Sequence, residues 1–245
     1  MKGIILAGGR GTRLFPLTKV TNKHLLPVGR EPMIFHPVRQ MVHAGVTDIL
    51  VVTSTEHMGE VVQLLGSGRD FECAFTYRVQ EEASGIAHAL ALGEDFAGAS
   101  PILVLLGDNI FTHSILPFTA HFLDQGGGAR VLLKAVGKPQ RYGVAALDEH
   151  QVIEIEEKPS QPKTPYAVVG GYCYDSQVWQ IIAGLEPSLR GEYEITAVNN
   201  EYIRRRALHY DIVEGDWTDA GTFESLSEAN AMMLACGNRI QGCPP

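Results

Sequence analysis

The chain has 245 residues, 45% hydrophobic and 20% charged, so it can build a sizeable core and is not intrinsically disordered. Twenty lysines and arginines against 28 aspartates and glutamates give a formal net charge of −8, which argues against a protein that coats nucleic acid. The densest apolar run, Ile102–Leu106, is far shorter than the ~18 residues needed to span a bilayer. One small phosphorylated ligand in a locally basic pocket remains compatible with this composition.

The start of the chain and its cysteines indicate a cytoplasmic protein. The apolar stretch Ile4–Ala7 is too short for the core of a signal peptide. The cysteines form no Cys-x-x-Cys pair, so we expect reduced thiols, with neither a metal site nor a disulfide framework. They are Cys73, Cys173, Cys236 and Cys243.

Short apolar runs alternate with amphipathic stretches in the first half of the chain. Strands are expected over Lys2–Leu6, Asp48–Thr53, Glu72–Val79 and Pro101–Leu106. Helices are expected over Pro32–Ala44, with a kink at Pro37, and over Glu56–Leu65 and Ile86–Leu92. This alternation predicts an α/β fold with a mostly parallel sheet and helices on both of its faces.

The second half mixes strands with helices, and no stretch of it resembles a flexible linker. Strands are expected over Ala129–Val136, Val144–Leu147, Val152–Glu156 and Tyr166–Tyr174, the third of them half-exposed because polar and apolar residues alternate. Helices are expected over Ser176–Ala183, Thr196–Arg205 and Phe223–Leu234. We therefore expect a single domain over residues 1–245, with one continuous sheet and a small lobe grown from its second half.

A glycine-rich segment follows the first strand directly and reads Leu6-Ala7-Gly8-Gly9-Arg10-Gly11-Thr12-Arg13-Leu14. Glycines let the backbone approach a ligand closely, and successive N–H groups in such a turn form an anion-binding concavity. Arg13 adds a planar donor fork suited to phosphate, and Lys23 adds a second cation nearby. With these cations, a phosphate site is favoured over a plain strand-to-loop turn.

This segment belongs to neither of the two best-known phosphate loops. A dinucleotide fingerprint needs a glycine where Leu14 stands and an acidic residue near Val51–Ser54, at the end of the second strand. A Walker A loop needs Gly-Lys-Ser/Thr, which the chain lacks. The nine histidines show no metal-ligand spacing and are interpreted as surface or core residues. Arg204–Arg206 are interpreted as cations at a helix end, where they favour the helix dipole.

Further motifs follow in a fixed order along most of the chain. They are Gly8-Gly9-x-Gly11-Thr12-Arg13-Leu14-x-Pro16-x-Thr18, Lys23-x-Leu25-Leu26-Pro27-Val28, Gln80, Gly85, Leu106-Gly107-Asp108-Asn109, Arg141-Tyr142-Gly143-Val144, Glu156-Glu157-Lys158-Pro159, Arg190-Gly191-Glu192 and Trp217-x-Asp219-x-Gly221-Thr222. In this order they resemble the sugar-1-phosphate nucleotidyltransferases, and within them the glucose-1-phosphate thymidylyltransferases.

The resemblance implies a fold and a division of labour. The fold would be the Rossmann-like nucleotide-diphospho-sugar transferase fold, a mixed, mostly parallel sheet flanked by helices, with a small sugar-binding lobe. Residues from 1 to about 110 would bind the nucleotide, and residues from about 111 to 235 would bind the sugar and complete a metal site. The partners would be a nucleoside triphosphate and a sugar 1-phosphate, without nucleic acid or membrane.

The implied reaction transfers a nucleotidyl group from dTTP or UTP to a sugar 1-phosphate, glucose 1-phosphate being the family default, and releases pyrophosphate. The attacking phosphate has a second pKa of about 6, so it needs no general base at neutral pH. An inactive nucleotide- or sugar-sensing subunit of the same fold is the alternative, although such a protein would be expected to lose Arg13, Asp108, Lys158 or Asp219, which are all present. A Rossmann oxidoreductase is disfavoured by the missing fingerprint.

The resemblance also implies roles for individual residues. Arg13 and Lys23 would neutralise the leaving pyrophosphate, and Lys158 would hold the attacking phosphate. Mg²⁺ would be held by Asp108 and Asp219, because this ion takes one or two carboxylates together with phosphate oxygens and water. The nucleotide would contact Leu6, Ala7, Gly8, Gly9, Gly11, Thr12, Arg13, Lys23, Gln80, Gly85 and Asp108. The sugar phosphate would contact Tyr142, Gly143, Glu157, Lys158 and Val168.

Taken without the family, several of these residues have simpler explanations. Asp108 could cap a turn, Lys158 could belong to a surface ion-pair cluster, and Gln80 could be a surface residue. Two positions depart from the family pattern: Val169 stands where threonine is common, which predicts a lost polar contact to the sugar, and Ala220 also replaces a frequent threonine.

The end of the chain resembles a short form of the family. Ala235–Pro245 follows the last expected helix and has little helix potential, where full-length members usually carry a further helical segment. That segment helps build a regulatory nucleotide site and a tetramer interface. The resemblance therefore predicts a monomer or dimer rather than a tetramer, without inhibition by the end product at a second site.

Overall fold

The computed structural model describes residues 1–149, 151–237 and 240–241. The strands of its main sheet are β1 (Lys2–Ala7), β4 (Asp48–Ser54), β5 (Ala74–Gln80), β6 (Ile102–Leu106), β8 (Ala129–Ala135), β9 (Gly143–Asp148), β10 (Gln151–Glu157), β11 (Tyr166–Tyr174) and β12 (Leu208–Ile212). Within the described residues these nine strands follow the order β10-β9-β11-β6-β1-β4-β5, with β8 beside β11 and β12 beside β8. The predicted continuous sheet is confirmed.

The strands from the first half of the chain are parallel and buried on both faces. β1 lies between β4 and β6, and β4 pairs in turn with β5. Ile4 and Leu6 of β1 point into one core, whereas Ile5 and Ala7 point into the other. Burial on both faces explains why these strands read as continuous apolar runs rather than as alternating patterns.

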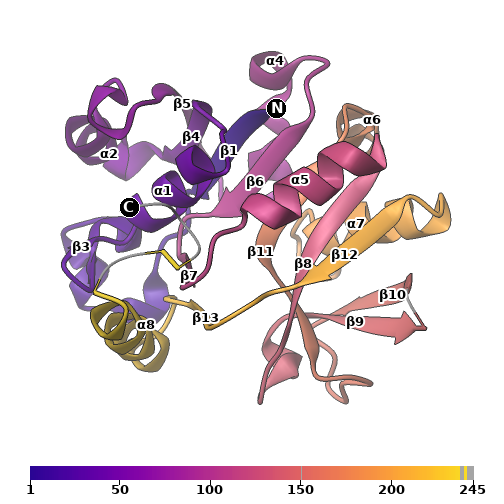
Figure 1. Ribbon diagram of the computed structural model, residues 1–245. Coiled ribbons are helices and arrows are strands. Elements are labelled where there is room, and N and C mark those ends of the chain that lie inside the picture. Colours follow the sequence, from indigo (N-terminus) through magenta and orange to yellow (C-terminus); the bar gives the residue numbers. More distant parts are fainter. Residues whose placement is uncertain (150, 238–239, 242–245) are drawn as a thin grey trace.

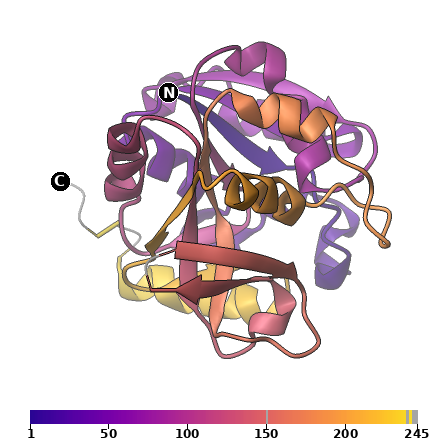
Figure 2. The same cartoon turned by 90° about the vertical axis from the view of Figure 1, so that its right-hand side faces the viewer.

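The sheet divides at β11. Gly171–Tyr174 at its carboxyl end pair with β6, and Ala167 near its start pairs with β9. β8 runs antiparallel to β11, with a register shift between Val168 and Tyr172. β9 and β10 form an antiparallel pair at the opposite end of the molecule from β5, and this pair crosses the front of Figure 2. The small lobe is therefore an outgrowth of the sheet that leaves it beside the carboxyl end of β6.

Helices cover both faces of the sheet (Figure 1). One apolar core lies under α3, α6 and α7, and the other lies under α1, α2 and α5. The helices are α1 (Phe35–His43), α2 (Met58–Leu65), α3 (Ile86–Ala91), α4 (Glu94–Ala97), α5 (Leu116–Gln125), α6 (Gln177–Ala183), α7 (Ile195–Arg204) and α8 (Phe223–Ala235). None of the helices within the described residues is long and apolar enough to cross a membrane.

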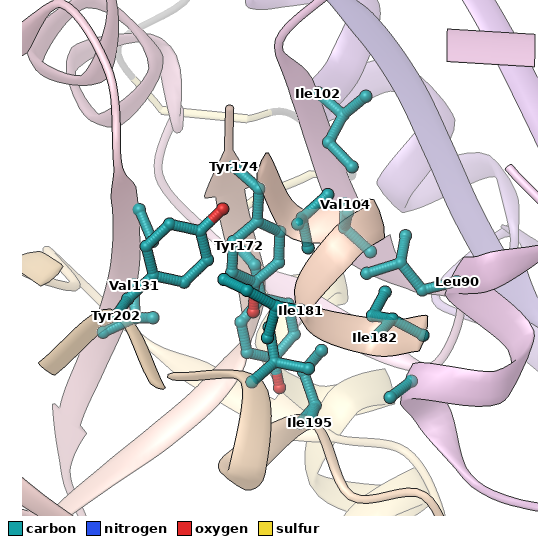
Figure 3. Packing of buried hydrophobic residues seen from close by; sticks show 14 of the residues in the cluster. Leu90, Ile102, Val104, Val131, Tyr172, Tyr174, Ile181, Ile182, Ile195 and Tyr202 are labelled. Carbon is teal, nitrogen blue, oxygen red and sulfur yellow. The ribbon is translucent and has the colours of Figure 1, made fainter. Parts of the chain in front are cut away.

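Three tyrosine rings pack among the aliphatic side chains of the first core (Figure 3). Tyr174 of β11 stacks on Tyr202 of α7 with ring centroids 5.7 Å apart, and on Tyr172 with centroids 6.0 Å apart. The Tyr174 hydroxyl donates to Asn199 Oδ1 at 2.6 Å, so this buried hydroxyl is paired, whereas Asn199 Nδ2 has no hydrogen-bond partner among the described residues. Stacking and hydrogen bonding together fix α7, whose first residues face the cleft described below.

Two short ladders stand apart from the main sheet. β7 (Asn109–Phe111) pairs antiparallel with β13 (Trp217–Asp219), and β2 (Pro27–Val28) pairs with β3 (Glu31–Pro32). A third apolar cluster joins them to α8, which lies beside β13 in Figure 1. The β7–β13 ladder was not predicted, and it joins residues from the two halves of the chain.

Some predicted boundaries are wrong for identifiable reasons. The helix predicted from Pro32 begins at Phe35, because Pro32 belongs to β3. Pro37 lies in the first turn of α1, where backbone N–H groups have no intrahelical acceptor, so the expected kink has no cause. The strand predicted from Glu72 begins at Ala74, since Glu72 has a left-handed φ of 58° that ends a 3-10 turn. The helix predicted from Glu56 begins at Met58, after another 3-10 turn.

Cys73, Cys173 and Cys236 are free thiols, and burial raises the pKa of Cys73 to about 11. Cys243 lies outside the described residues.

Candidate active site

The glycine-rich segment leaves β1 and wraps around the side chain of Lys23. A Cβ at Gly9 would lie 3.1 Å from Lys23 Cε, and one at Gly11 would lie 2.9 Å from Lys23 Cβ. Gly11 also has a left-handed φ of 64°, which favours glycine. The absence of side chains at these glycines therefore leaves room for the Lys23 side chain along the loop. The sequence alone did not indicate this role.

Lys23 forms an ion pair with Asp108, and both side chains are largely buried, at 11% and 13% exposure. Asp108 follows β6 and also accepts a hydrogen bond from Asn109 Nδ2 at 2.9 Å. Burial alone would raise the pKa of Asp108, but the charge of Lys23 and the smaller contributions of His24 and of the hydrogen bonds from Lys23 and Asn109 together outweigh it and hold this pKa well below its usual range. Asp108 is thus a permanent anion, and its role as a simple turn cap is wrong.

The β7–β13 ladder brings Asp219 to Asp108. Its register pairs Asn109 with Asp219, and the Ala220 N–H donates to the Asp108 carbonyl at 2.8 Å. A Cβ at Gly221 would lie 3.1 Å from Arg13 Nη2, 3.5 Å from Asp219 Oδ2 and 3.7 Å from Asp108 Oδ2. Arg13 and both carboxylates therefore surround one point, although more than a hundred residues separate the two aspartates.

Asp219 is held on its other side by the small lobe. Tyr142 donates its hydroxyl to Asp219 Oδ1 at 2.9 Å, and Arg141 Nη2 lies 3.5 Å from both carboxylate oxygens. Burial and then the nearby charge of Asp108 raise the pKa of Asp219 above its usual value. The two carboxylates thus repel each other, and a cation between them would relieve that repulsion.

This pair fits a hard divalent cation that takes its remaining ligands from substrate and water. Among the described residues, no group of three or more histidine, cysteine, aspartate or glutamate side chains could hold a metal. Mg²⁺ is often bound through only one or two carboxylates plus phosphate oxygens, so two suffice.

Asn109 fixes the position of this pair. Its Oδ1 accepts the Gly170 N–H at 3.0 Å and the Trp217 Nε1–H at 2.8 Å, while its Nδ2 donates to Asp108. The side chain is only 3% exposed, and its contacts with Gly170 and Trp217 are buried. Asn109 thereby ties β11, β13 and the end of β6 together at the point where the sheet divides.

Gly170→Ala is expected to destabilise the protein by about 1–3 kcal/mol, the usual cost of overpacking a rigid core. The new Cβ would lie 2.7 Å from the amide atoms of Asn109, which cannot move without breaking its other hydrogen bonds. Urea unfolding of Gly170→Ala measures the effect. Gly137→Ala is the matched control, because its Cβ meets nothing within 4 Å. Equal stability of the two variants would contradict the rigidity of Asn109.

The residues expected to bind the sugar phosphate lie around the carboxyl end of β10. Thr196 Oγ1 donates to Glu157 Oε2 at 2.6 Å, and Lys158 Nζ lies 3.4 Å from Glu157 Oε1. Arg190 Nη1 approaches the same Glu157 oxygen at 3.5 Å. Lys158 has a left-handed φ of 45°, which is strained for a residue other than glycine. Lys158 thus forms the expected surface ion pair with Glu157. Its backbone also has a strained conformation of the kind that clusters at functional sites.

Two adjoining cavities join these groups into one cleft. The first, of about 270 Å³, contains the glycine-rich loop, and the second, of about 600 Å³, contains Asp219; both are lined by Asp108, Glu157 and Lys158. The predicted site residues in the first are Leu6, Gly8, Gly9, Lys23, Gln80, Gly85, Asp108, Glu157 and Lys158. Those in the second are Thr12, Arg13, Asp108, Tyr142, Gly143, Glu157, Lys158, Val168 and Asp219.

Three predicted features differ from this arrangement. Ala7 and Gly11 line neither cavity. The carbonyl of Ala7 instead accepts from Asn22 Nδ2, and that of Gly11 accepts from Thr18 Oγ1. Val169 packs in the apolar core, because it points to the opposite face of β11 from Val168. The expectation that Val169 removes a polar contact to the sugar is therefore wrong.

The far end of the first cavity carries neutral polar groups. Gln80 ends β5 as predicted and is 7% exposed, so its interpretation as a surface residue is wrong. His24 lines the same cavity, which the sequence did not indicate. Burial, reinforced by the charge of Lys23, lowers the pKa of His24 to about 3, so this ring is neutral at physiological pH. Both groups can form hydrogen bonds without adding charge.

Sequence reasoning missed several residues that line the cleft. Arg141, Asn109 and Arg190 stood within the quoted motifs without an assigned role, and Thr196 had no motif at all. A further cavity of about 660 Å³ lies behind Tyr142 and shares Arg141 with the cleft. It lacks the glycine-rich loop and both aspartates, so the candidate chemistry belongs to the cleft.

Known proteins resemble this chain over nearly its whole length. The profile of the nucleotidyl transferase family matches residues 2–235. The glucose-1-phosphate thymidylyltransferase of Neisseria meningitidis (serogroup A) is 41% identical over 242 residues, covering 97% of this chain and 84% of that protein. The glucose-1-phosphate thymidylyltransferase of Xanthomonas campestris pv. campestris is 44% identical over 232 residues, covering 93% of this chain and 79% of that protein.

Solved structures share the fold. A Bacillus anthracis protein, named as a candidate glucose-1-phosphate thymidylyltransferase and solved with sucrose, superposes with a TM-score of 0.92 at 56% identity. The match covers 95% of this chain and 94% of that one. A UDP-glucose pyrophosphorylase bound to UDP-glucose superposes with a TM-score of 0.85 at 25% identity, covering 97% and 99%. The predicted nucleotide-diphospho-sugar transferase fold is confirmed, and the chain belongs to the nucleotidyl transferase family.

Proposed function

We propose that this protein transfers a thymidylyl group from dTTP to glucose 1-phosphate and releases pyrophosphate. The observation that carries the proposal is the convergence of Arg13, Asp108 and Asp219 around one point, between the glycine-rich loop and Lys158. The names of the relatives support this pair of substrates. UTP is the alternative triphosphate, because uracil and thymine present the same hydrogen-bonding edge and differ by one methyl group.

The reaction requires alignment and charge neutralisation rather than a general base. An oxygen of the sugar phosphate would attack the α-phosphorus in line while pyrophosphate leaves, and this oxygen is mostly ionised at neutral pH. Arg13 and Lys23 would neutralise the leaving pyrophosphate, and Lys158 would hold the attacking phosphate. Arg190 lines the same part of the cleft and would add a further positive charge.

The metal that we propose for this site is Mg²⁺, held by Asp108 and Asp219. When bound, it would withdraw negative charge from the phosphate oxygens of the two substrates. The buried carboxylate pair supports this assignment, because the charge of Asp108 already disfavours ionisation of Asp219. Tyr142 and Arg141 would hold Asp219 in its orientation through the contacts that they make with its oxygens.

We expect the pKa of one carboxyl group to lie above that of an ordinary aspartate and the pKa of the other to lie below it. The pKa of Asp219 is raised, so it should take up a proton first as the pH falls, whereas Asp108 should stay ionised because its pKa is lowered. Carboxyl ¹³C NMR measures both, with the asparagine variants providing the assignment. Adding Mg²⁺ should lower the apparent pKa of Asp219, since a cation favours the ionised form. An Asp219 signal that titrates in the ordinary range and ignores Mg²⁺ would contradict the proposed metal site.

The proposed activity is tested by measuring pyrophosphate release across a grid of nucleoside triphosphates and sugar 1-phosphates. We expect the highest kcat/KM for dTTP with glucose 1-phosphate. Without a divalent cation we expect no pyrophosphate release. An inactive sensing subunit would bind the same ligands without turnover. The division into a nucleotide half and a sugar half, the cytoplasmic location and the monomeric or dimeric state stay predictions, and light scattering measures the last of these.

A further inference from the structure

Gln80 is held at the end of β5 by close contacts with three other parts of the chain. Its Oε1 lies 2.8 Å from the position that a Cβ on Gly8 would take, so the amide rests against the backbone of the glycine-rich loop. Its Nε2 lies 3.4 Å from the Gly85 carbonyl oxygen and 3.3 Å from His88 Nδ1. These contacts fix the position of the amide. Its orientation then decides whether it presents a donor or an acceptor to a ligand.

The partners of the amide determine which end is oxygen and which is nitrogen. A carbonyl oxygen can only accept, so the group facing Gly85 must be the NH₂ of Gln80. His88 Nδ1 lies beside the same NH₂ and must therefore accept, which requires the imidazole proton on Nε2. Both N–H donors of Gln80 are then used within the protein. Only Oε1 remains for a ligand, and it can only accept.

His88 is itself fixed in place. It lies on α3 with its ring stacked on Tyr193, with centroids 6.0 Å apart and planes at 27°. Tyr193 is joined to the start of α3 by backbone hydrogen bonds, since its N–H donates to Ser84 and its carbonyl accepts from Ala87. The acceptor on His88 thus has a defined position relative to Gln80.

We propose that His88 is a positioning residue for base selection: by accepting from Gln80 it keeps the amide oxygen turned towards the nucleotide, so that the cleft favours a pyrimidine with an N3–H donor. This inference rests on the proposed nucleotidyl transfer for its substrate. Thymine and uracil carry that donor, whereas cytosine presents a bare N3 lone pair, which would face the lone pairs of Oε1. A buried acceptor facing an acceptor loses a hydrogen bond and cannot regain it from water.

The experiment compares two variants of similar side-chain size. In His88→Asn the amide oxygen can occupy the place of Nδ1 and accept from Gln80, whereas His88→Leu has no acceptor. Calorimetry with dTTP and with dCTP, in Mg²⁺ buffer without sugar phosphate, gives the affinity ratio for each protein. We expect His88→Leu to lose about fivefold to tenfold of the wild-type preference for dTTP, the size of one neutral hydrogen bond, and His88→Asn to keep it.

Each other result overturns the inference or the proposed function separately. A His88→Leu ratio equal to that of the wild type, an equal fall for dTTP and dCTP, or the same loss in His88→Asn would show that His88 does not orient Gln80. A wild-type protein that binds neither nucleotide, or binds both equally, would also overturn it. A wild-type protein that prefers dTTP but forms no sugar nucleotide would refute the transfer reaction and leave the role of His88 standing.

Discussion

Asp108→Asn and Asp219→Asn are each expected to lower turnover about a hundredfold or more, yet only Asp108→Asn is expected to lower stability. The loss of turnover has one cause, because both variants remove a preorganised charge from the proposed metal site. The effects on stability differ because the two carboxylates have different surroundings.

Asp108→Asn leaves a buried cation without its partner. Lys23 is 11% exposed and runs along the glycine-rich loop, so its ammonium group is largely shielded from water. Removing one member of a buried ion pair usually costs about 3–5 kcal/mol. The pair stabilises the folded protein fully at pH values above the ordinary pKa of an aspartate. This stabilisation is lost as the pH falls towards the lowered pKa of Asp108.

Asp219→Asn removes a charge that the folded protein disfavours. A carboxyl group with a raised pKa in the folded state opposes folding at neutral pH, and this penalty vanishes as the pH falls through that pKa. Asparagine has nearly the same shape and can still accept from the Tyr142 hydroxyl. We therefore expect a free energy of unfolding at neutral pH equal to or above that of the wild type.

Urea unfolding at neutral pH, together with an Mg²⁺ titration of activity, measures both effects. Asp124→Asn on the surface helix α5 serves as the control and should change neither quantity. Turnover that persists without a divalent cation would contradict the metal site. Equal destabilisation by the two asparagine variants would contradict the different surroundings of the two carboxylates.

The parts of the fold that the sequence predicted are those with a strong local pattern. The strand Tyr166–Tyr174 and the parallel strands around β1 are apolar runs bounded by breakers, and the structure confirms their existence. α5 was missed, although it has a proline in its first turn and a glycine at its end. The β7–β13 ladder has three residues on each side and little local signal, because it forms only when the two halves of the chain are folded against each other.

The candidate site divides along the same line. Glycines next to cations identified the loop, since that pattern is local. The meeting of Asp108 with Asp219 depends on the register of a tertiary ladder, and the burial of Lys23 depends on glycines at two separate positions. The orientation of Gln80 depends on His88 and Gly85, whose contacts arise only when α3 packs beside the end of β5. These contacts form only when separate elements of the fold pack together, so no local sequence pattern indicates them.

Lys158→Ala is expected to lower turnover about a hundredfold while leaving the affinity for dTTP nearly unchanged, because the proposed role of Lys158 is to hold the attacking phosphate. Calorimetry and pyrophosphate release separate the two quantities. Lys163→Ala is the matched control, since Lys163 lies on the same lobe and pairs with Glu154 on the surface. A comparable fall in dTTP affinity would instead assign Lys158 to the nucleotide.

The backbone at this position makes a second variant informative. Lys158 has a φ of 45°, a left-handed conformation that costs a residue with a Cβ about 1–2 kcal/mol and costs glycine almost nothing. Lys158→Gly should therefore be as inactive as Lys158→Ala, yet more stable than the alanine variant by about 1 kcal/mol in urea unfolding. Lys158 pairs only weakly with Glu157 at 45% exposure, so that contact cannot offset the strain. Activity in Lys158→Gly would contradict the assignment of Lys158 to the sugar phosphate. A Lys158→Gly variant less stable than Lys158→Ala would contradict the backbone strain at this position.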